Sequence, residues 1–263
     1  MTPESNLASQ PTSSASAAAP QGFLSRLIGV YFSPGETFQE IGRAPRVLVP
    51  LLALMVMGAL VGFLMINRIG IQTFFSKQYE QAVQSGQMTQ EQANQALERV
   101  TSGPAATFVK ASFPIFGAIN WAVIALILAG AFKLVSMLVG ADNEFKPLFS
   151  VTLYALLAVF LISSVLVVIL LYLKNPEEID INNLVASNLN ALLAWAVGKD
   201  GLPKFVMALA RWIDLFAIWA IALLAIGYAA VSRRLKTSTA AIALGCIYGV
   251  VALIGAAWSA LRG

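Results

Sequence analysis

The chain has 263 residues, with 17 Lys and Arg against 13 Asp and Glu and therefore a net charge of +4. Charged residues are only 11% and apolar residues 58% of the total, and the mean hydropathy is +0.76. A soluble domain is about 45–50% apolar and about one quarter charged, so this composition excludes an ordinary soluble domain. It predicts an all-α bundle of membrane-spanning helices. The chain has no His, which excludes His-based zinc sites and Ser–His or Cys–His nucleophiles. It has one Cys, Cys246, which excludes an intrachain disulfide.

Residues 1–21 are mostly Ser, Ala, Pro and polar residues and carry one charge, Glu4. The segment has no apolar run long enough for the h-region of a signal peptide. We expect a disordered tail there, followed by a single membrane domain over residues 22–263.

The first residues of that domain predict two short helices. Apolar residues recur at helical spacing beside Arg26, which is typical of an amphipathic helix in the membrane interface. These residues are Phe23, Leu24, Leu27, Ile28 and Tyr31. Ser33 and Glu36 then form a capping-box pattern around Pro34, a residue that favours the first helical position, so we expect a second helix that runs to about Arg43.

Five apolar stretches follow, each long enough, at about 20 residues, to cross a hydrocarbon core of about 30 Å. They are Val47–Ile66, Phe113–Phe132, Leu148–Leu173, Trp212–Val231 and Ala240–Leu261. We expect the second to continue past Lys133 toward Val139, and the fourth has an alternative start near Phe205. The count of five spans is a firmer expectation than their ends.

The distribution of basic residues predicts the orientation of the spans. With the N-terminus inside, eight Lys and Arg lie on the cytoplasmic side and nine on the other side, which is an even tally. The outer residues are spread over long loops, whereas the inner ones lie close to span ends, including the run Arg233–Lys236 in a very short loop. Because basic residues near span ends set the topology, we expect a cytoplasmic N-terminus and an extracytoplasmic C-terminus.

Both outer loops are predicted to contain helices. The first, residues 68–112, has eight Gln between positions 72 and 95 and a capping-box pattern at Thr89–Gln92, which predict a solvated helical hairpin. The second has one apolar stripe opposite several Asn residues, which is typical of a helix that lies on the membrane surface or covers the end of the bundle. The stripe consists of Val185, Leu189, Leu192, Leu193 and Ala196.

Asp214 is the only carboxylate inside a predicted span, and an ionisable residue within the membrane needs a partner. Arg211 lies three residues earlier on the same helix face and is the expected partner. Asp214 is then a proton or cation site, a buried polar contact that fixes helix assembly, or a residue near the outer boundary that water or Arg211 satisfies. We favour the boundary position over a transport role, because one carboxylate without a second acid or a His makes a poor proton relay.

Other polar and small residues inside the spans indicate helix packing. Asn120 in the second span and Ser163 and Ser164 in the third are able to hydrogen-bond across helices, and we interpret them as packing contacts, not as a substrate site. Small residues at four-residue spacing allow helices to approach closely, either between chains or, as we favour, within one chain. They are Gly58 and Gly62 in the first span and Ala241, Gly245 and Gly249 in the fifth.

Three stretches of the sequence also resemble a known family. They are LSRLIGVYFSPGETFQEIGRAPRVLVPLL at 24–52, GADNEFKPLFSVTLYA at 140–155 and ARWIDLFAIWAIALLAIGYAAVSRRLK at 210–236. The last contains a D-L-F-x-I-W pattern that runs from Asp214 to Trp219. Over roughly residues 22–261, the chain is similar to the Yip1-domain integral membrane proteins.

The resemblance implies a five-helix membrane domain with a cytoplasmic N-terminus, a tendency to oligomerise and no enzymatic activity. Eukaryotic members of the family act in vesicle traffic with Rab-type GTPases. This chain lacks their D-L-Y-G-P signature and carries the Gln-rich outer hairpin, so it is similar to the bacterial branch. The resemblance therefore implies a location in a bacterial cytoplasmic membrane, and the GTPase partner is not carried over.

We expect a non-enzymatic membrane protein that organises partners through its N-terminal amphipathic helix and its small-residue helix faces. Arg211, Asp214, Asn120 and Trp219 are the candidate polar or assembly residues. The expected partners are the lipid bilayer and either a second copy or other membrane proteins, with no nucleic acid, cofactor, metal or identifiable small-molecule substrate. The alternative is a transporter or channel subunit that uses Asp214 in its pathway, whereas the lack of His and of P-loop, nucleophile-elbow or H-E-x-x-H motifs disfavours an enzyme.

Overall fold

The structure is a computed structural model that describes residues 21–141, 143–180, 183–198, 201–232 and 234–262. Helices make up the regular elements of these residues, which confirms the all-α prediction. In chain order they are α1 (Phe23–Phe32), α2 (Pro34–Arg43), α3 (Leu48–Ile69), α4 (Ile71–Gln84), α5 (Gln90–Thr101), α6 (Gly103–Leu138), α7 (Phe145–Leu173), the short 3-10 helix η1 (Pro176–Glu178), α8 (Leu189–Val197), α9 (Lys204–Trp212), α10 (Leu215–Val231) and α11 (Thr237–Arg262). The predicted disordered tail lies outside the described residues, apart from Gln21.

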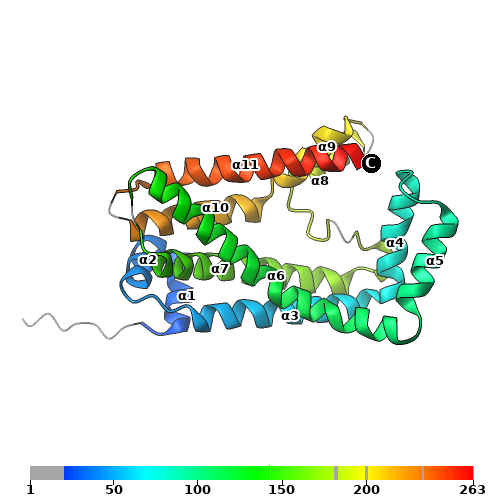
Figure 1. Ribbon diagram of the computed structural model, residues 1–263, viewed down its shortest axis with the longest axis horizontal. Helices are drawn as coiled ribbons and strands as arrows, with labels where there is room; N and C mark the ends of the chain where they lie inside the picture. The colour runs from blue at the N-terminus through cyan, green and yellow to red at the C-terminus, as the bar shows by residue number, and fades with distance from the viewer. Residues whose placement is uncertain (1–20, 142, 181–182, 199–200, 233, 263) are drawn as a thin grey trace, which may run out of the picture.

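Among the described residues, four helices are long and apolar enough to cross a membrane: α3, α6, α7 and α11. The chain is therefore an integral, multi-pass membrane protein. The fourth predicted span, Trp212–Val231, is interrupted, because α9 ends at Trp212 and α10 begins at Leu215. With 17 residues and 1.5 Å of rise per residue, α10 is about 25 Å long. It packs between α7 and α11 (Figure 1), and a fifth crossing through α10 stays a prediction.

The second span runs further than its hydropathy alone predicted. Its expected continuation past Lys133 is confirmed, since α6 ends at Leu138. At its other end the helix begins at Gly103, ten residues before the predicted start, and passes through Pro114 without stopping. A helix of 36 residues is about 54 Å long, so α6 extends well beyond a hydrocarbon core of about 30 Å or crosses it at a tilt.

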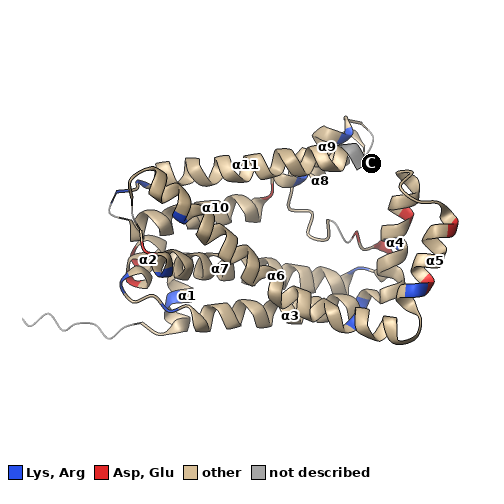
Figure 2. Cartoon of the chain, viewed as in Figure 1, with Lys and Arg blue, Asp and Glu red and all other residues tan. Residues whose placement is uncertain are grey.

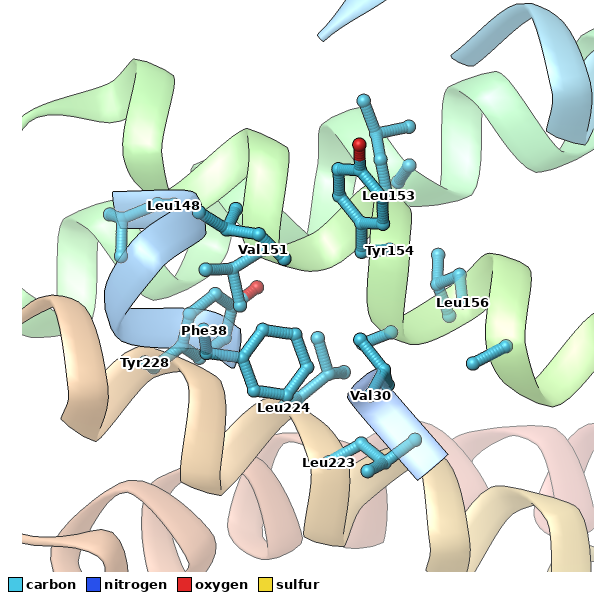
Figure 3. Close-up of a cluster of buried hydrophobic side chains, with 14 of the residues drawn as sticks. Val30, Phe38, Leu148, Val151, Leu153, Tyr154, Leu156, Leu223, Leu224 and Tyr228 are labelled. Carbon is cyan, nitrogen blue, oxygen red and sulfur yellow. The ribbon is translucent and has the colours of Figure 1, made fainter. Parts of the chain in front are cut away.

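Helix α7 is the centre of the bundle. It packs against α1, α2, α3, α6 and α10, and every residue from Ser150 to Phe160 is buried. A helix that is apolar all round belongs in a core, and α7 is apolar in this way. Figure 3 shows the resulting cluster, in which side chains of α7 meet those of α1, α2 and α10; it includes Val30, Phe38, Leu148, Val151, Leu153, Leu223 and Leu224.

The two N-terminal helices form a pair that packs against α7 and α10. The predicted apolar stripe of α1 is divided, because Leu27 is buried while Leu24 and Ile28 are 66% and 56% exposed. The helix α1 is thus packed into the bundle on one face and presents apolar side chains outward on the other. Pro34 begins α2 as predicted, but the predicted cap is wrong: the Ser33 side chain makes no capping hydrogen bond, since its ψ of 63° departs from the extended backbone of an N-cap.

Helices α4 and α5 form a hairpin at one end of the bundle, where the Gln-rich segment indicated one (Figure 1). Thr89 and Gln92 make both hydrogen bonds of a capping box at the start of α5. No residue of α4 is buried, and Ala93 is the buried residue of α5. The hairpin is joined to the second outer loop by Lys77, whose Nζ donates to three carbonyl oxygens, those of Pro176 (3.4 Å), Glu177 (2.6 Å) and Ile179 (2.8 Å).

The predicted helix of the second outer loop is present but shorter than its apolar stripe. It begins at Leu189, because the Asn188 side chain accepts a hydrogen bond from the Ala191 N–H and caps α8. Val185 therefore precedes the helix. The stripe is not buried either, since Leu192 is 64% exposed and Trp195, on the same short helix, is 87% exposed.

Candidate functional site

Asp214 lies in the break between α9 and α10 and caps α10. Its Oδ1 accepts hydrogen bonds from the backbone N–H groups of Phe216 (2.9 Å) and Ala217 (3.1 Å), and its Oδ2 accepts one from the Ser187 hydroxyl. The backbones of Asn188 and Asp214 also form an antiparallel bridge. A carboxylate at a helix N-terminus is stabilised by the helix dipole. This site therefore fixes the segment just before α8 to the start of α10 and satisfies the charge of Asp214 within the chain.

The predicted pairing of Arg211 with Asp214 is wrong. Arg211 is exposed in the last turn of α9, whereas Asp214 has extended backbone angles after that helix has ended. The two residues therefore do not share a helix face. Asp is a preferred N-cap because its side chain reaches the backbone N–H groups of the next turn, and that local bond, together with Ser187, replaces the expected ion pair.

Trp219 lies one turn further along α10, against the N-terminal helix pair. Its ring centroid is 5.9 Å from that of Tyr31 on α1. The Tyr31 hydroxyl in turn donates to the carbonyl oxygen of Ala158 on α7, at 2.7 Å. Burial raises the pKa of Tyr31 above its usual value, because it disfavours the charged phenolate. The two ends of the D-L-F-x-I-W pattern thus have separate structural roles: Asp214 starts α10, and Trp219 holds α1 against it.

A buried ion pair fastens α1 to α2, and the sequence analysis missed it. The Arg26 side chain is fully buried, and its Nη2 lies 3.3 Å from Glu40 Oε1. Its Nη1 donates to the Ala44 carbonyl oxygen at 2.8 Å, and Glu40 also accepts from the Gln21 N–H at 3.0 Å. Buried charges need such partners. The signal in the sequence was Arg26 among the apolar residues of the first helix, with acidic residues in the helix that follows the turn at Ser33.

The predicted close approach at Gly58 and Gly62 occurs between α3 and α6. A Cβ at Gly58 would overlap the carbonyl oxygen of Gly117, and one at Gly62 would lie 2.6 Å from the carbonyl oxygen of Phe113. Gly117 was not predicted, although its own Cβ would overlap the Gly58 carbonyl. Backbones in contact at such a crossing require residues without side chains.

The other two candidate glycines have no neighbour of this kind. A Cβ at Gly245 or Gly249 of α11 would meet no atom of the described residues within 4 Å. The favoured expectation of packing within the chain therefore holds at the α3–α6 crossing and fails on this face of α11. These glycines lie on a face that remains open for a contact with another chain or with lipid.

The expected hydrogen bonds from Asn120 and the two serines across helices are absent. Ser163 and Ser164 donate to carbonyl oxygens one turn earlier on α7, at 3.2 and 3.0 Å, as hydroxyls inside helices commonly do. Asn120 is exposed on α6 and has no hydrogen-bond partner in the part of the chain that the structure describes. A buried polar contact between helices is formed instead by Thr152 of α7 and Tyr228 of α10, whose oxygens are 2.6 Å apart.

The structure contains a polar cavity of about 690 Å³ where α2 ends and the α6–α7 and α10–α11 connections meet. Glu144 and Arg234 are its charged lining residues, and Arg234 Nη1 donates to the Gly140 carbonyl oxygen at 2.8 Å. No group of three or more Cys, Asp or Glu that could hold a metal ion occurs among the described residues. Arg234 thus binds the α6–α7 connection that borders the cavity.

Four membrane-spanning helices, of which α7 lies buried at the centre of the bundle, define a polytopic membrane protein of the helical-bundle class. The family model of the Yip1 domain matches residues 28–259. The chain therefore belongs to the Yip1 domain family, as the three sequence stretches indicated. A search among curated proteins and a search among solved structures gave no match.

Proposed function

We propose that the chain is a non-enzymatic scaffold of a bacterial cytoplasmic membrane that organises other membrane proteins through helix contacts. The observation that carries this proposal is that two charged groups, Arg26 through its Nη atoms and Asp214 through both carboxylate oxygens, are bound to other parts of the chain. Arg26 is held by Glu40, and Asp214 is held by Ser187 and the start of α10. Groups that hold the fold in this way are not free to bind a substrate or to relay a proton.

Two helix faces that are open to contact with other chains also support the proposal. Around Gly245 and Gly249, α11 presents a face where backbones from another helix have room to approach closely. The outward residues of α1, which include Leu24 and Phe32, offer a second apolar surface. Membership of the Yip1 domain family supports a membrane role that needs no catalytic residues.

The proposed orientation has a cytoplasmic N-terminus and an extracytoplasmic C-terminus. Figure 2 shows most of the charged residues toward the two ends of the bundle, with few along the middle of the long helices. The helix pair α1–α2 lies at one end, and α11 finishes at the opposite end (Figure 1). An odd number of crossings, with α10 as the fifth, accounts for this placement. The basic residues Arg26, Arg43 and Arg46 beside the first crossing favour the cytoplasm for the N-terminal end.

Affinity purification in mild detergent, with mass spectrometry of the proteins that co-purify, tests the scaffold role. Gly245→Leu puts bulk on the open face of α11 without an internal clash, so we expect a folded variant that loses its partner. Ala257→Leu is the matched control, because it adds the same bulk at an exposed position of the same helix, and we expect it to keep the partner.

Proton flux in proteoliposomes tests the transport alternative. Asp214→Asn keeps a side-chain oxygen that can cap α10 while it removes the charge. We expect the wild type and this variant to show no flux above that of empty liposomes. A flux that the wild type supports and the variant loses would overturn the scaffold proposal in favour of transport through Asp214.

A further inference from the structure

Asn120 is a polar residue without a partner in a membrane-spanning helix. It lies within α6, exposed, and no described residue of the chain donates to it or accepts from it. Its amide has two N–H donors and an oxygen with two lone pairs. In a hydrocarbon core neither water nor lipid tails can satisfy these groups, so a partner from outside the chain is required.

The surroundings of Asn120 provide space for such a partner. Asn120 lines an open groove of about 580 Å³ between α3 and α6, whose other lining residues are largely apolar or aromatic, among them Gly62, Met65, Phe113, Phe116 and Val123. The groove exists because the backbones of Gly58 and Gly117 touch, which leaves no side chains to fill the space beside the crossing. Among the described residues that line this groove, Asn120 is the one with an amide side chain.

The face of α6 that carries Asn120 has the spacing of a helix-pairing seam. Phe116, Val123, Ile127 and Leu134 are exposed. Together with Asn120 and the half-buried Gly130, they follow the alternating steps of four and three residues that define the a and d positions of a heptad. In two-stranded helix pairs, a single Asn at such a position sets the register and favours a dimer. Helix α6 runs obliquely across the bundle (Figure 1), so the contact is centred on a crossing point and does not extend along the whole helix.

We propose that Asn120 pairs with Asn120 of a second copy of this chain, across a two-fold axis along the membrane normal. The amide side chain is self-complementary, because each copy donates one N–H to the oxygen of the other. A second copy in the same orientation places an identical amide at the axis, whereas an unrelated chain would need a polar group at that depth by coincidence. This inference rests on the proposed scaffold function for its biological meaning and adds a partner to it.

Cysteine cross-linking in native membranes tests the proposed axis. In a Cys246→Ser background, which removes the exposed natural thiol, Val123→Cys should form a disulfide-linked dimer on oxidation. Leu60→Cys is the matched control: it lies on α3 half a turn from the Gly58–Gly117 crossing, and it is 54% exposed against 46% for Val123. We expect it to remain monomeric.

A variant without the amide distinguishes a hydrogen-bonded Asn120 pair from two helices that are merely close to each other. Interhelical hydrogen bonds in membranes are worth roughly 0.6 to 1.7 kcal/mol, so Asn120→Val should lower the Val123→Cys dimer yield, or the association constant measured by energy transfer in liposomes, by about 3- to 20-fold. The variant replaces an exposed amide with an apolar group and is not expected to unfold the chain. Asn120→Gln keeps an amide and should retain more of the dimer than Asn120→Val.

Three results would overturn the inference. The first is equal cross-linking from Val123→Cys and Leu60→Cys, and the second is a dimer that Asn120→Val leaves unchanged. The third is a monomer in native mass spectrometry that carries a bound lipid lost in Asn120→Val, which would assign the groove to lipid. In each case, a heterologous partner that still co-purifies and is lost in Gly245→Leu would leave the scaffold proposal standing, so the failures of the two proposals are distinguishable.

Discussion

Gly58 of α3 and Gly117 of α6 lie back to back, and the carbonyl oxygen of each occupies the place where the other would carry a Cβ. This contact sets how closely the first two membrane-spanning helices approach. It also opens the groove beside Asn120. The two glycines are 59 positions apart in the sequence, so neither position reveals the other as its partner.

Gly117→Ala should destabilise the bundle by about 1–3 kcal/mol, because overpacking of a close contact forces the helices apart. The measurement is the free energy of unfolding in detergent micelles, followed by Trp fluorescence. Gly130→Ala on the same helix is the control, since a Cβ there meets no described atom within 4 Å. We expect that variant to be as stable as the wild type or slightly more stable. Equal losses in both variants would contradict the role of the crossing.

The elements that the sequence predicted well are those whose cause is local. Hydropathy placed α3, α7 and α11 within a few residues of their ends, because burial in a membrane depends on the composition of one continuous stretch. The capping box at Thr89 and Gln92 is equally local and forms as the pattern indicates. The interruption before α10 has a local cause as well, but hydropathy does not detect it: Asp214 was counted as a charge within a span, although Asp is also a strong N-cap.

The features that the sequence did not reveal depend on tertiary contacts. Arg26 occupies a position typical of the polar face of an amphipathic helix, yet it is fully buried because α2 folds back and brings Glu40 to it. The pair of Thr152 and Tyr228 is formed by residues 76 positions apart. Asn120 lacks a partner among the described residues because the other helices cover a different face of α6. The pattern of residues within α6 does not reveal which face they cover.

The cap on α10 predicts a specific order of stability among Asp214 variants. Asp214→Ala removes the acceptor for the Phe216 and Ala217 N–H groups and should cost about 1 kcal/mol or somewhat more. Asp214→Asn keeps that acceptor and should cost only a few tenths of a kcal/mol, since Asn and Asp are nearly equal N-caps. Thermal unfolding of the purified protein checks the order. An Asn variant as unstable as the Ala variant would show that the charge, not the cap, matters.

The ion pair of Arg26 and Glu40 predicts that substitution of Glu40 lowers the free energy of unfolding and that a second substitution recovers most of that loss. Glu40→Leu leaves the Arg26 guanidinium buried without its counter-charge, which costs about 3–5 kcal/mol when both groups are buried. Because the Glu40 side chain is 26% exposed, solvent screening reduces this to about 2 kcal/mol. Adding Arg26→Met removes the orphaned charge and should recover most of the loss. A double-mutant cycle on the unfolding free energy measures the coupling, and additive losses would contradict the pairing.

The contacts of Lys77 predict a local effect at the end of the bundle that carries α4 and α5. Its ammonium group donates to three carbonyl oxygens of the segment around η1, which ties the α4–α5 hairpin to the loop after α7. Lys77→Met keeps most of the length of the side chain and removes the hydrogen-bond donor. Amide hydrogen exchange should therefore become faster in α4 and at residues 177–179, while α7 stays protected. Lys77→Arg retains donors at the same place and should show a smaller increase. Faster exchange throughout α7 in the Met variant would show that the contact supports the whole bundle and not the outer loops alone.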